Sequence, residues 1–593
     1  MANTLGWTIG EWQRAYHTDS LNAADALQAL RGALDPDDPA WIYILSSDEL
    51  QQQIDELTTA DEQPLYGIPF VLKDNIDAAG LPTTAACPTF AYTANKDATL
   101  VARLKAAGAI LLAKTNLDQF ATGLVGTRSP YGAVPNSFNP EYVSGGSSSG
   151  SAVAVARGLV PFSIGTDTAG SGRVPAGFNN IVGLKPTKGR FSINGVVPAC
   201  KSLDCTSVFA LTVEDAEAVA GIIEGFDPAD GFSRKQPYPA RLLPTQPRFG
   251  IPTDLPFFDD AEQEKAWRKT LNQLQQQGVE LVPMDFSAMQ TLAQLLYGGP
   301  WVAERHAAVG EFMHEHADKM NPVVRGIIDQ AQNFSATDAY RAEYRRAELV
   351  RSIQQSMATV DALLVPTAPR LPTIAEVEAD PVAVNSQLGT WTNFVNLADC
   401  SALALPAGMR DDGLPFGITL IGAAWQDTSL GEFGKRWQQS LKGTRGATGL
   451  ALPTATTPDT PPQGHIRLAV VGAHLTGMPL NSQLTERQAR LVETTHTSGD
   501  YRLFALPGTT PPKPGLVKAQ DGKPIIVELW DMPIDQFGSF VALIPAPLGI
   551  GTLTLVDGRQ VKGFICESLA TTDAEDITEF GGWRAYINAR RAS

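Results

Sequence analysis

Two glycine- and serine-rich stretches and a lysine before them carry the residue types needed to hydrolyse an amide. Lys73 lies in an apolar run at 67–75, Ser147 in the stretch 144–151, and Ser171 in the stretch 165–175. A serine attacks an amide only when a base takes its proton, and a buried lysine can stay neutral and serve as that base. Small residues before Ser171 let backbone N–H groups approach the developing oxyanion. We predict that Ser171 is the nucleophile, Lys73 the base and Ser147 the relay.

Each of these pieces has an ordinary structural explanation when it is considered alone. Gly/Ser-rich stretches usually form loops, and a single lysine usually lies at the surface or in an ion pair. The three pieces occur here in an order and at a spacing that favour the catalytic interpretation. A catalytically inactive protein with the same fold is the structural alternative.

Composition and charge limit the possible classes of protein. The 593 residues are 43% hydrophobic and 18% charged, which is typical of a folded chain with two or more domains. A formal net charge of −17 argues against broad binding to nucleic acid or to an anionic membrane. Without a leader-like N-terminus or a long apolar stretch, the sequence predicts a cytoplasmic protein. Five scattered cysteines predict reduced thiols and no metal site.

The pattern of apolar residues divides the chain into four parts. Residues 1–60 have helical spacing and predict helices on the outside of the main domain. Residues 61–440 alternate short apolar runs with helical segments, which predicts an α/β sheet. A Thr- and Pro-rich segment at 441–464 predicts a solvated linker. Residues 465–593 predict a small strand-rich domain, for which a closed barrel is one arrangement.

The order and the residues of the three motifs resemble those of the amidase signature family over roughly residues 60–430. The resemblance implies an α/β fold with a mixed β-sheet core covered by helices, and a Ser-cisSer-Lys triad at Ser171, Ser147 and Lys73. It also implies an oxyanion hole and a braced loop. The amides of the hole belong to Thr168, Ala169, Gly170 and Ser171, and the loop is braced by Asp167 and Arg173. Many members have glycine where this chain has Ala169, so Ala169 should have a negative φ or bear mild strain.

Five further segments look like allophanate hydrolase, at 115–128, 202–205, 297–305, 472–475 and 479–481. This resemblance extends over nearly the whole chain, and it implies allophanate as substrate with no cofactor. Arg305 suits the substrate carboxylate, and the resemblance implies that Tyr297 and Arg305 contact it. Pro300 as a first helical residue places Arg305 on a helix and Tyr297 just before it. Gly123 and Thr127 are weaker candidates for the pocket.

The implied reaction acylates Ser171 with release of ammonia, and water then releases N-carboxycarbamate, which can lose carbon dioxide. The smaller domain is implied to be an α+β domain that resembles the gamma-glutamyl cyclotransferase barrel and is linked to decarboxylation. His474 matches the histidine proposed to act there, with Asn481 and Glu528 as possible neighbours. A structural histidine is an equally open interpretation.

Two rival functions remain open at this point. One is a broad amidase or the amidase subunit of a tRNA-dependent amidotransferase, which the acidic charge and the Tyr297–Arg305 segment disfavour. The other is a catalytically silent scaffold that binds a metabolite, which the intact triad disfavours. The sequence shows no biotinyl-lysine region or ATP-binding motif, so we expect a hydrolase that is not fused to urea carboxylase. We also expect a homodimer that works with urea carboxylase or with other enzymes of urea or cyanuric acid degradation.

Overall fold

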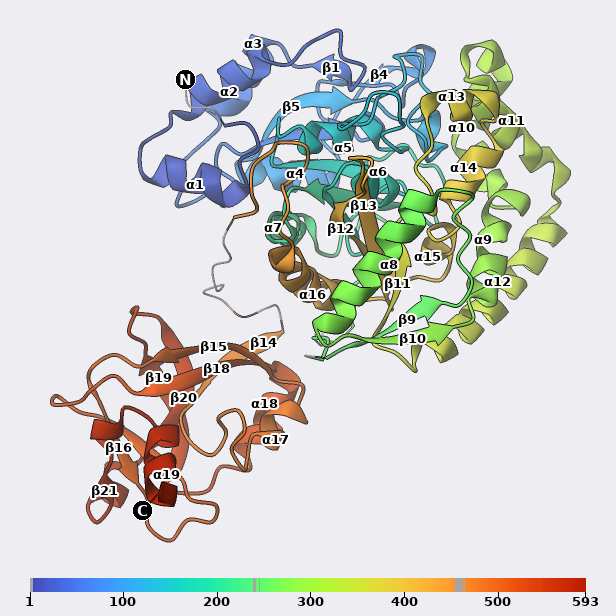
Figure 1. Ribbon diagram of the computed structural model, residues 1–593. Helices are drawn as coiled ribbons and strands as arrows, with labels where there is room; N and C mark the ends of the chain where they lie inside the picture. Colours follow the sequence, from blue (N-terminus) through green and yellow to red (C-terminus); the bar gives the residue numbers. More distant parts are fainter. Residues whose placement is uncertain (1–3, 238–241, 245, 454–460, 462–463, 593) are drawn as a thin grey trace. The chain divides into compact units, whose positions relative to one another are not determined.

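The computed structural model describes residues 4–237, 242–244, 246–453, 461 and 464–592. The chain divides into two compact units, a larger one of Met1–Gln236 with Gln246–Pro453 and a smaller one of Pro237–Thr245 with Thr454–Ser593 (Figure 1). No helix in the described part of the chain is both long and apolar enough to cross a membrane.

An eleven-stranded mixed sheet runs through the larger unit, in the order β1-β5-β2-β6-β8-β7-β12-β13-β11-β9-β10 (Figure 1). The strands are β1 Trp41–Ile44, β2 Pro69–Lys73, β5 Ile110–Thr115, β6 Phe162–Asp167, β7 Val182–Lys185, β8 Cys205–Ala210, β9 Arg248–Pro252, β10 Glu280–Met284, β11 Ala362–Pro366, β12 Ser401–Met409 and β13 Pro415–Gly422. β2 pairs in parallel with β5 and β6, whereas β6 and β8 are antiparallel. The predicted α/β sheet is therefore present, and it is mixed. A short hairpin of β3 Pro82–Thr83 and β4 Tyr92–Thr93 lies apart from it.

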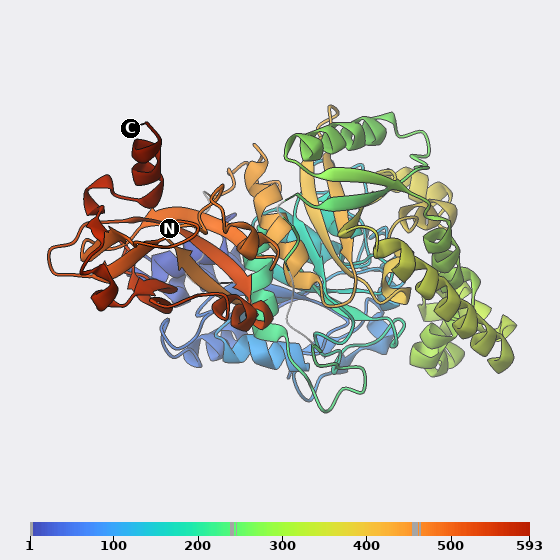
Figure 2. The same cartoon turned by 90° about the horizontal axis from the view of Figure 1, so that it is seen from below.

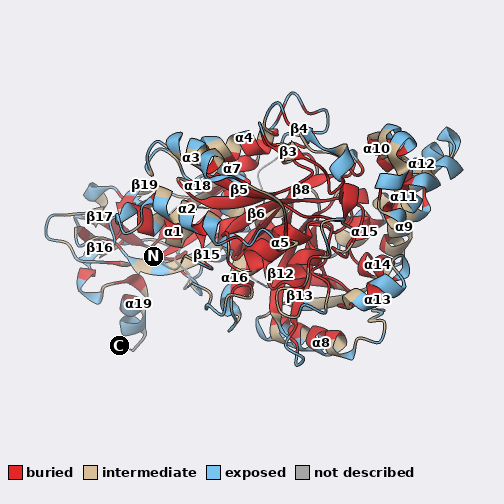
Figure 3. Cartoon of the chain, turned by 90° about the horizontal axis from the view of Figure 1, so that it is seen from above, coloured by how far each residue is buried: buried red, intermediate tan, exposed pale blue. Residues whose placement is uncertain are grey.

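The helix α5, Ser149–Ala156, is buried at every residue, as Figure 3 shows in red. It packs against β2 and β6. Small residues allow this close approach, since a Cβ at Gly150 would collide with the Ala40 carbonyl oxygen. Because α5 consists of small and apolar residues and has no charged side chain, it is stable only inside the protein. It begins two residues after Ser147 and fixes that residue at the centre of the unit.

Helices cover the sheet and the N-terminal part of the chain. They are α1 Ile9–His17, α2 Ala23–Gly32, α3 Ser47–Asp55, α4 Thr99–Ala106, α6 Val174–Phe178, α7 Val213–Ile223, α8 Ala261–Gln276, α13 Ile374–Ala379, α14 Ala383–Leu388, α15 Asn393–Leu397 and α16 Asp427–Ser440. The expectation of helices throughout 7–60 is wrong for β1, which pairs antiparallel with β5. Its sequence, Trp-Ile-Tyr-Ile, consists of aromatic and β-branched residues that favour a strand.

Four helices gather on one side of the larger unit (Figure 1 and Figure 2): α9 Ser287–Gly298, α10 Val302–His316, α11 Pro322–Asp329 and α12 Ala336–Met357. Arg305 lies on α10, as predicted. The helix starts at Val302 instead of Pro300, and Tyr297 belongs to the last turn of α9 instead of the turn between the helices. Met289, Leu292 and Leu296 hold α9 in the core at helical spacing, which carries the helix on through Tyr297.

The smaller unit has a five-stranded sheet in the order β15-β18-β14-β20-β19 and a three-stranded sheet in the order β17-β16-β21. Its strands are β14 His465–Val470, β15 Arg490–His496, β16 Tyr501–Ala505, β17 Pro514–Lys518, β18 Ile526–Pro533, β19 Leu548–Thr554, β20 Gln560–Cys566 and β21 Glu575–Asp576; its helices are α17 Ser482–Thr485, α18 Ile534–Val541 and α19 Trp583–Ala592. A bridge between Thr497 and Leu555 joins the two outer strands just beyond their ends. The five-stranded sheet thus curls back on itself, in the manner of the predicted barrel.

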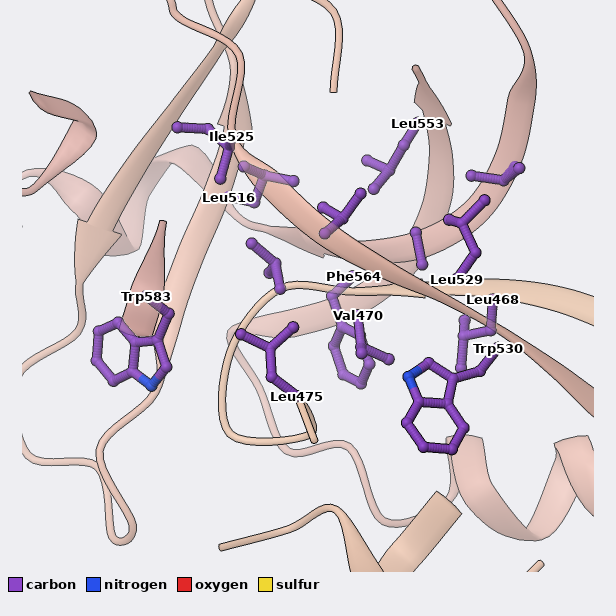
Figure 4. Close-up of a cluster of buried hydrophobic side chains, with 14 of the residues drawn as sticks. Leu468, Val470, Leu475, Leu516, Ile525, Leu529, Trp530, Leu553, Phe564 and Trp583 are labelled. Carbon is purple, nitrogen blue, oxygen red and sulfur yellow. The ribbon is translucent and has the colours of Figure 1, made fainter. Parts of the chain in front are cut away.

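One apolar core fills the smaller unit, as the close-up in Figure 4 shows. Leu468 and Val470 from β14 meet Leu529 from β18 and Phe564 from β20, and Trp583 of α19 belongs to the same cluster. Burial of such side chains stabilises a unit of this size by about 1.5 to 3 kcal/mol per large residue. The smaller unit therefore has a core of its own.

The linker predicted over 441–464 does not begin at 441. Arg445 forms an ion pair with Glu11, and the Gly446 and Ala447 N–H groups donate to Asn180 and Ala156. These contacts hold this part of the segment against the larger unit. Residues 454–460 and 462–463 of the predicted linker lie outside the described residues.

Candidate active site

Lys73 stands at the end of β2 and is completely buried. Its Nζ donates to Ser147 Oγ at 2.7 Å and to Thr166 Oγ1 at 2.6 Å. Ser147 follows a cis peptide bond from Gly146 and is also fully buried. The structure therefore joins the predicted base to the predicted relay by a direct hydrogen bond.

Burial lowers the pKa of Lys73 to about 7, against the opposing influence of Asp118, Asp204 and Asp167. Removal from water disfavours the ammonium form, and the three carboxylates recover only part of that cost. A large share of the Lys73 amine is consequently neutral near pH 7. This is the protonation state that a general base requires.

Ser171 precedes α6 and is 3% exposed. Its Oγ lies 3.5 Å from the Gly123 carbonyl oxygen, which is the far limit for a hydrogen bond. Gly123 is only a weak candidate on sequence grounds, yet the structure brings it to the predicted nucleophile. A Cβ at this position would lie 2.5 Å from Asp118 Oδ2, so only glycine fits. The partly exposed Thr127 has no described hydrogen bond that ties it to the site.

The loop from 167 to 173 is braced by a buried ion pair. Arg173 donates from Nε and Nη2 to the two carboxylate oxygens of Asp167, both at 2.9 Å. Burial acts to raise the pKa of Asp167, but the Arg173 guanidinium outweighs it and holds that pKa below its usual range. The same carboxylate accepts from the N–H groups of Gly170 at 3.0 Å and Gly172 at 2.9 Å. Asp167 and Arg173 therefore occupy the positions expected of residues that support the loop.

The Gly170 N–H, one of the four donors predicted for the oxyanion hole, donates to Asp167 within the loop. The hydrogen bonds described for this loop leave the N–H groups of Thr168, Ala169 and Ser171 without a protein acceptor. Gly170 has a φ of +141°, and a Cβ there would lie 2.5 Å from Thr392 Oγ1. Ala169 keeps a negative φ, as predicted for a residue with a Cβ at this point.

Arg305 is 2% exposed and reaches the loop that contains Gly123. Its Nη1 donates to Thr122 Oγ1 at 2.8 Å, and its Nη2 donates to the Tyr297 hydroxyl at 3.2 Å. The guanidinium carbon also lies 5.2 Å from the centre of the Tyr297 ring. The structure therefore brings Tyr297 and Arg305 together, and through Thr122 it places them one residue away from Gly123.

Sequence reasoning missed three polar residues that complete this region. Thr166 accepts from Lys73, Asp118 binds the loop 125–128, and Asp204 accepts from the Thr168 hydroxyl. Burial raises the pKa of Asp204 to about 6, even though it accepts several hydrogen bonds. Thr166 immediately precedes Asp167, and that adjacency was the only signal for it in the sequence.

His474 lies in the smaller unit beside a cavity of about 30 Å³. Its ring stacks on Phe564 with centroids 5.0 Å apart and meets the edge of Phe540 at 5.2 Å. Its Nε2 lies 2.9 Å from Gln483 Oε1, and burial lowers its pKa despite that contact. His474 is therefore mainly neutral at pH 7.

The two predicted neighbours of His474 differ in what they do. Asn481 donates from Nδ2 to the His474 carbonyl oxygen at 2.8 Å, so it fixes the turn. Glu528 instead accepts from Thr476, Trp530 and Arg584. The pocket beside His474 is lined by Gln483 and Lys513, which the sequence does not single out. Among the described residues, no group of His, Cys, Asp or Glu side chains is arranged to hold a metal ion.

Comparison with known proteins assigns both units. Residues 30–430 match the family Amidase, and residues 466–588 match the Allophanate hydrolase C-terminal domain. The chain is 46% identical to the urea amidolyase of Saccharomyces cerevisiae over 98% of its own length and 33% of that protein. It is 35% identical to one subunit of the glutamyl-tRNA(Gln) amidotransferase of Roseiflexus castenholzii, over 71% of its own length and 92% of that relative.

Solved structures agree with these matches. Kluyveromyces lactis allophanate hydrolase is 44% identical, with a TM-score of 0.85 over 99% of this chain and 100% of that one. The chain spans about a third of the length of the curated urea amidolyases that it matches. The urea amidolyases and the Kluyveromyces lactis hydrolase therefore cover both units in a single chain.

Proposed function

Because the chain belongs to the amidase family and carries an allophanate hydrolase C-terminal domain, we propose that it hydrolyses allophanate to ammonia and N-carboxycarbamate. The observation that carries this proposal is the buried hydrogen bond from Lys73 to Ser147, beside the loop that bears Ser171. This arrangement supplies a neutral base and a relay without a cofactor.

In the first half of the reaction, Ser171 Oγ attacks the carbonyl carbon of the terminal amide. Its proton passes to Ser147 as Ser147 gives its own to the neutral Lys73. The relay requires the Ser171 hydroxyl to turn from the Gly123 carbonyl toward Ser147. The amine then returns the proton to the leaving nitrogen, and ammonia departs from the acyl-enzyme.

The oxyanion formed in this attack requires fixed donors. We propose that the amides of Thr168, Ala169 and Ser171 supply them. The Gly170 amide contributes by holding the loop against Asp167. Preorganised donors in a dry site stabilise such a transition state by a few kcal/mol each. The Arg173 ion pair keeps these donors in place before the substrate arrives.

The carboxylate of allophanate distinguishes it from a neutral amide. We propose that Arg305 pairs with this carboxylate and that Tyr297 orients the guanidinium through the 3.2 Å hydrogen bond. The planar fork of an arginine suits a carboxylate. Gly123 links Thr122, which Arg305 contacts, to the nucleophile Ser171.

Water then attacks the acyl-enzyme and frees Ser171. The product is N-carboxycarbamate, which bears two carboxylates and can lose carbon dioxide. We propose that His474 in the smaller unit takes part in that second step, with Gln483 fixing its tautomer. Its neutral form supports this role.

We infer that 61–440 holds the hydrolytic site, that 1–60 packs on it, that 441–464 includes a linker, and that 465–593 is the second domain. We also infer a cytoplasmic homodimer that receives allophanate from a urea carboxylase. The curated urea amidolyases support a link of this kind, because this chain matches a third of their length.

An ammonia assay of the purified chain tests the function. Allophanate should give the highest kcat/KM, malonamate should be turned over more slowly, and urea and biuret should be poor substrates because they lack the carboxylate. Lack of ammonia from allophanate, or a preference for neutral amides, would favour a broad amidase instead. Retained turnover in Ser171→Ala would refute the nucleophile.

A further inference from the structure

Two buried guanidinium groups converge on Thr122. Arg305 Nη1 donates to Thr122 Oγ1 at 2.8 Å, and Arg128 Nη1 donates to the Thr122 carbonyl oxygen at 3.0 Å. Arg128 and Arg305 are each 2% exposed, and Thr122 is completely buried. The next residue, Gly123, faces Ser171. A second cation therefore lies in the same part of the site as the proposed carboxylate ligand.

Neither guanidinium has a carboxylate at ion-pair distance among the described residues, although the charges of Asp204 and Glu304 act on Arg305. Within the described part of the chain, no ion pair joins Arg128 or Arg305 to a carboxylate, and both Nε atoms are buried without a hydrogen-bond acceptor. The remaining contact of Arg128 is to the Pro381 carbonyl oxygen at 2.5 Å. Arg173 is equally buried, but its charge is balanced, because it forms a bidentate ion pair with Asp167. A buried cation without a counter-ion is unfavourable, so the site suits an anion.

The acids that act on the two guanidinium groups hydrogen-bond to other groups: Asp204 accepts from the Thr168 hydroxyl and Glu304 from the Ser202 N–H. Asp118 uses its two carboxylate oxygens to accept from the N–H groups of Val125, Gly126 and Arg128. Burial lowers the pKa of Arg128, and the charge of Arg305 adds to that lowering while Asp118 and Tyr297 oppose it. Arg128 and Arg305 are thus near enough to affect each other.

We propose that Arg128 supplies a second positive charge to the substrate site and makes it selective for dicarboxylates. This inference rests on the proposed function. Allophanate is a monoanion, but attack of water on the Ser171 acyl group breaks the ester bond to Oγ and forms a second carboxylate. The oxygen of that new group comes from water, and one proton from the same water returns to Ser171 while the other is released. Arg305 alone balances the substrate, whereas Arg128 and Arg305 together balance the dianion.

Binding measurements on the full chain test this role without turnover. In the Ser171→Ala background, malonate serves as the dianion and malonamate as the monoanion, and calorimetry gives each Kd. We expect malonate to bind at least about tenfold more tightly than malonamate, which corresponds to about 1.4 kcal/mol. Arg128→Gln should remove that preference, and Arg128→Lys should restore part of it. Equal weakening of both ligands, or no weakening, would overturn the proposal.

Arg103 provides a matched control, because among the described residues it also donates only to carbonyl oxygens, those of Ile223 and Gly225. Arg103→Gln should leave both Kd values unchanged. If Arg128→Gln does not fold, the Ser171→Ala chain with Arg128 intact still decides, because binding of malonamate as tight as that of malonate would contradict a doubly cationic site. Failure of the ammonia assay on allophanate would refute the proposed function separately, since the malonate preference requires no turnover.

Discussion

The larger and the smaller unit each bury a nitrogen base, but they surround it differently. Lys73 and His474 both have a pKa that burial lowers. Lys73 touches two hydroxyl groups, and one of these is the predicted relay to a serine. His474 touches one amide and two aromatic rings. Burial alone keeps a base neutral, whereas the hydrogen bond from Lys73 to Ser147 gives that base a route to the proposed nucleophile.

Removing a member of the triad should have the largest effect. Lys73→Met, Ser147→Ala and Ser171→Ala should each lower kcat/KM for ammonia release from allophanate by about 10⁴-fold or more, because the three act as one unit. Steady-state ammonia assays on folded protein measure this. Ser151→Ala is the control, since its hydroxyl bonds to Thr115 and not to the triad. A Ser147 variant as active as the Ser151 variant would remove the relay from the mechanism.

Changing the carboxylate ligand should have the next largest effect. Arg305→Gln should raise KM for allophanate about 10- to 100-fold, because a hydrogen bond to a charged group contributes about 1.5 to 3 kcal/mol. Tyr297→Phe should raise it less, since the guanidinium stays in place. Initial rates over a range of allophanate concentrations separate KM from kcat. An unchanged KM in Arg305→Gln would show that the carboxylate binds elsewhere.

The sequence predicts the chemistry of the larger unit better than its geometry. Lys73, Ser147 and Ser171 are recognisable because the reaction requires their residue types in Gly/Ser-rich surroundings. Thr166 was missed because its contact with Lys73 depends on the parallel register of β2 and β6, where Leu72 faces Ile164. Sequence spacing does not contain the register of two strands separated by nearly a hundred residues.

The helical layer and the smaller unit show the same limit. The start of α10 at Val302 and the place of Tyr297 on α9 depend on how Leu292 and Leu296 pack in the core, which local signals such as Pro300 do not reveal. His474 is recognisable from its glycine-rich turn. Its partners Gln483 and Phe564 come from other elements, so only the fold brings them together.

The pH dependence distinguishes the two buried bases with a smaller effect. Lys73 must be neutral, so kcat/KM should rise with pH and level off above its pKa of about 7. Thr166→Val removes an acceptor that favours the ammonium form, which should lower the midpoint by up to about one pH unit. Rate profiles between pH 5 and 9 measure this. A midpoint that stays fixed in Thr166→Val but moves in His474→Gln would contradict this expectation and assign the titration to His474 in the smaller unit.

His474→Gln should have the smallest effect on the first reaction. The triad and the carboxylate ligands lie in the larger unit, so release of the first ammonia should stay within about twofold of wild type, as for substitutions without a contact to the reacting atoms. Glutamine keeps the polarity of the site but cannot exchange a proton near pH 7. If His474 acts on N-carboxycarbamate, release of carbon dioxide should lag behind ammonia in the variant, and simultaneous assays of the two gases would show the lag. A variant without a lag would leave His474 as a structural residue between Phe540 and Phe564, and the hydrogen-bonded base in the larger unit would then be the chain's one catalytic base among the residues described.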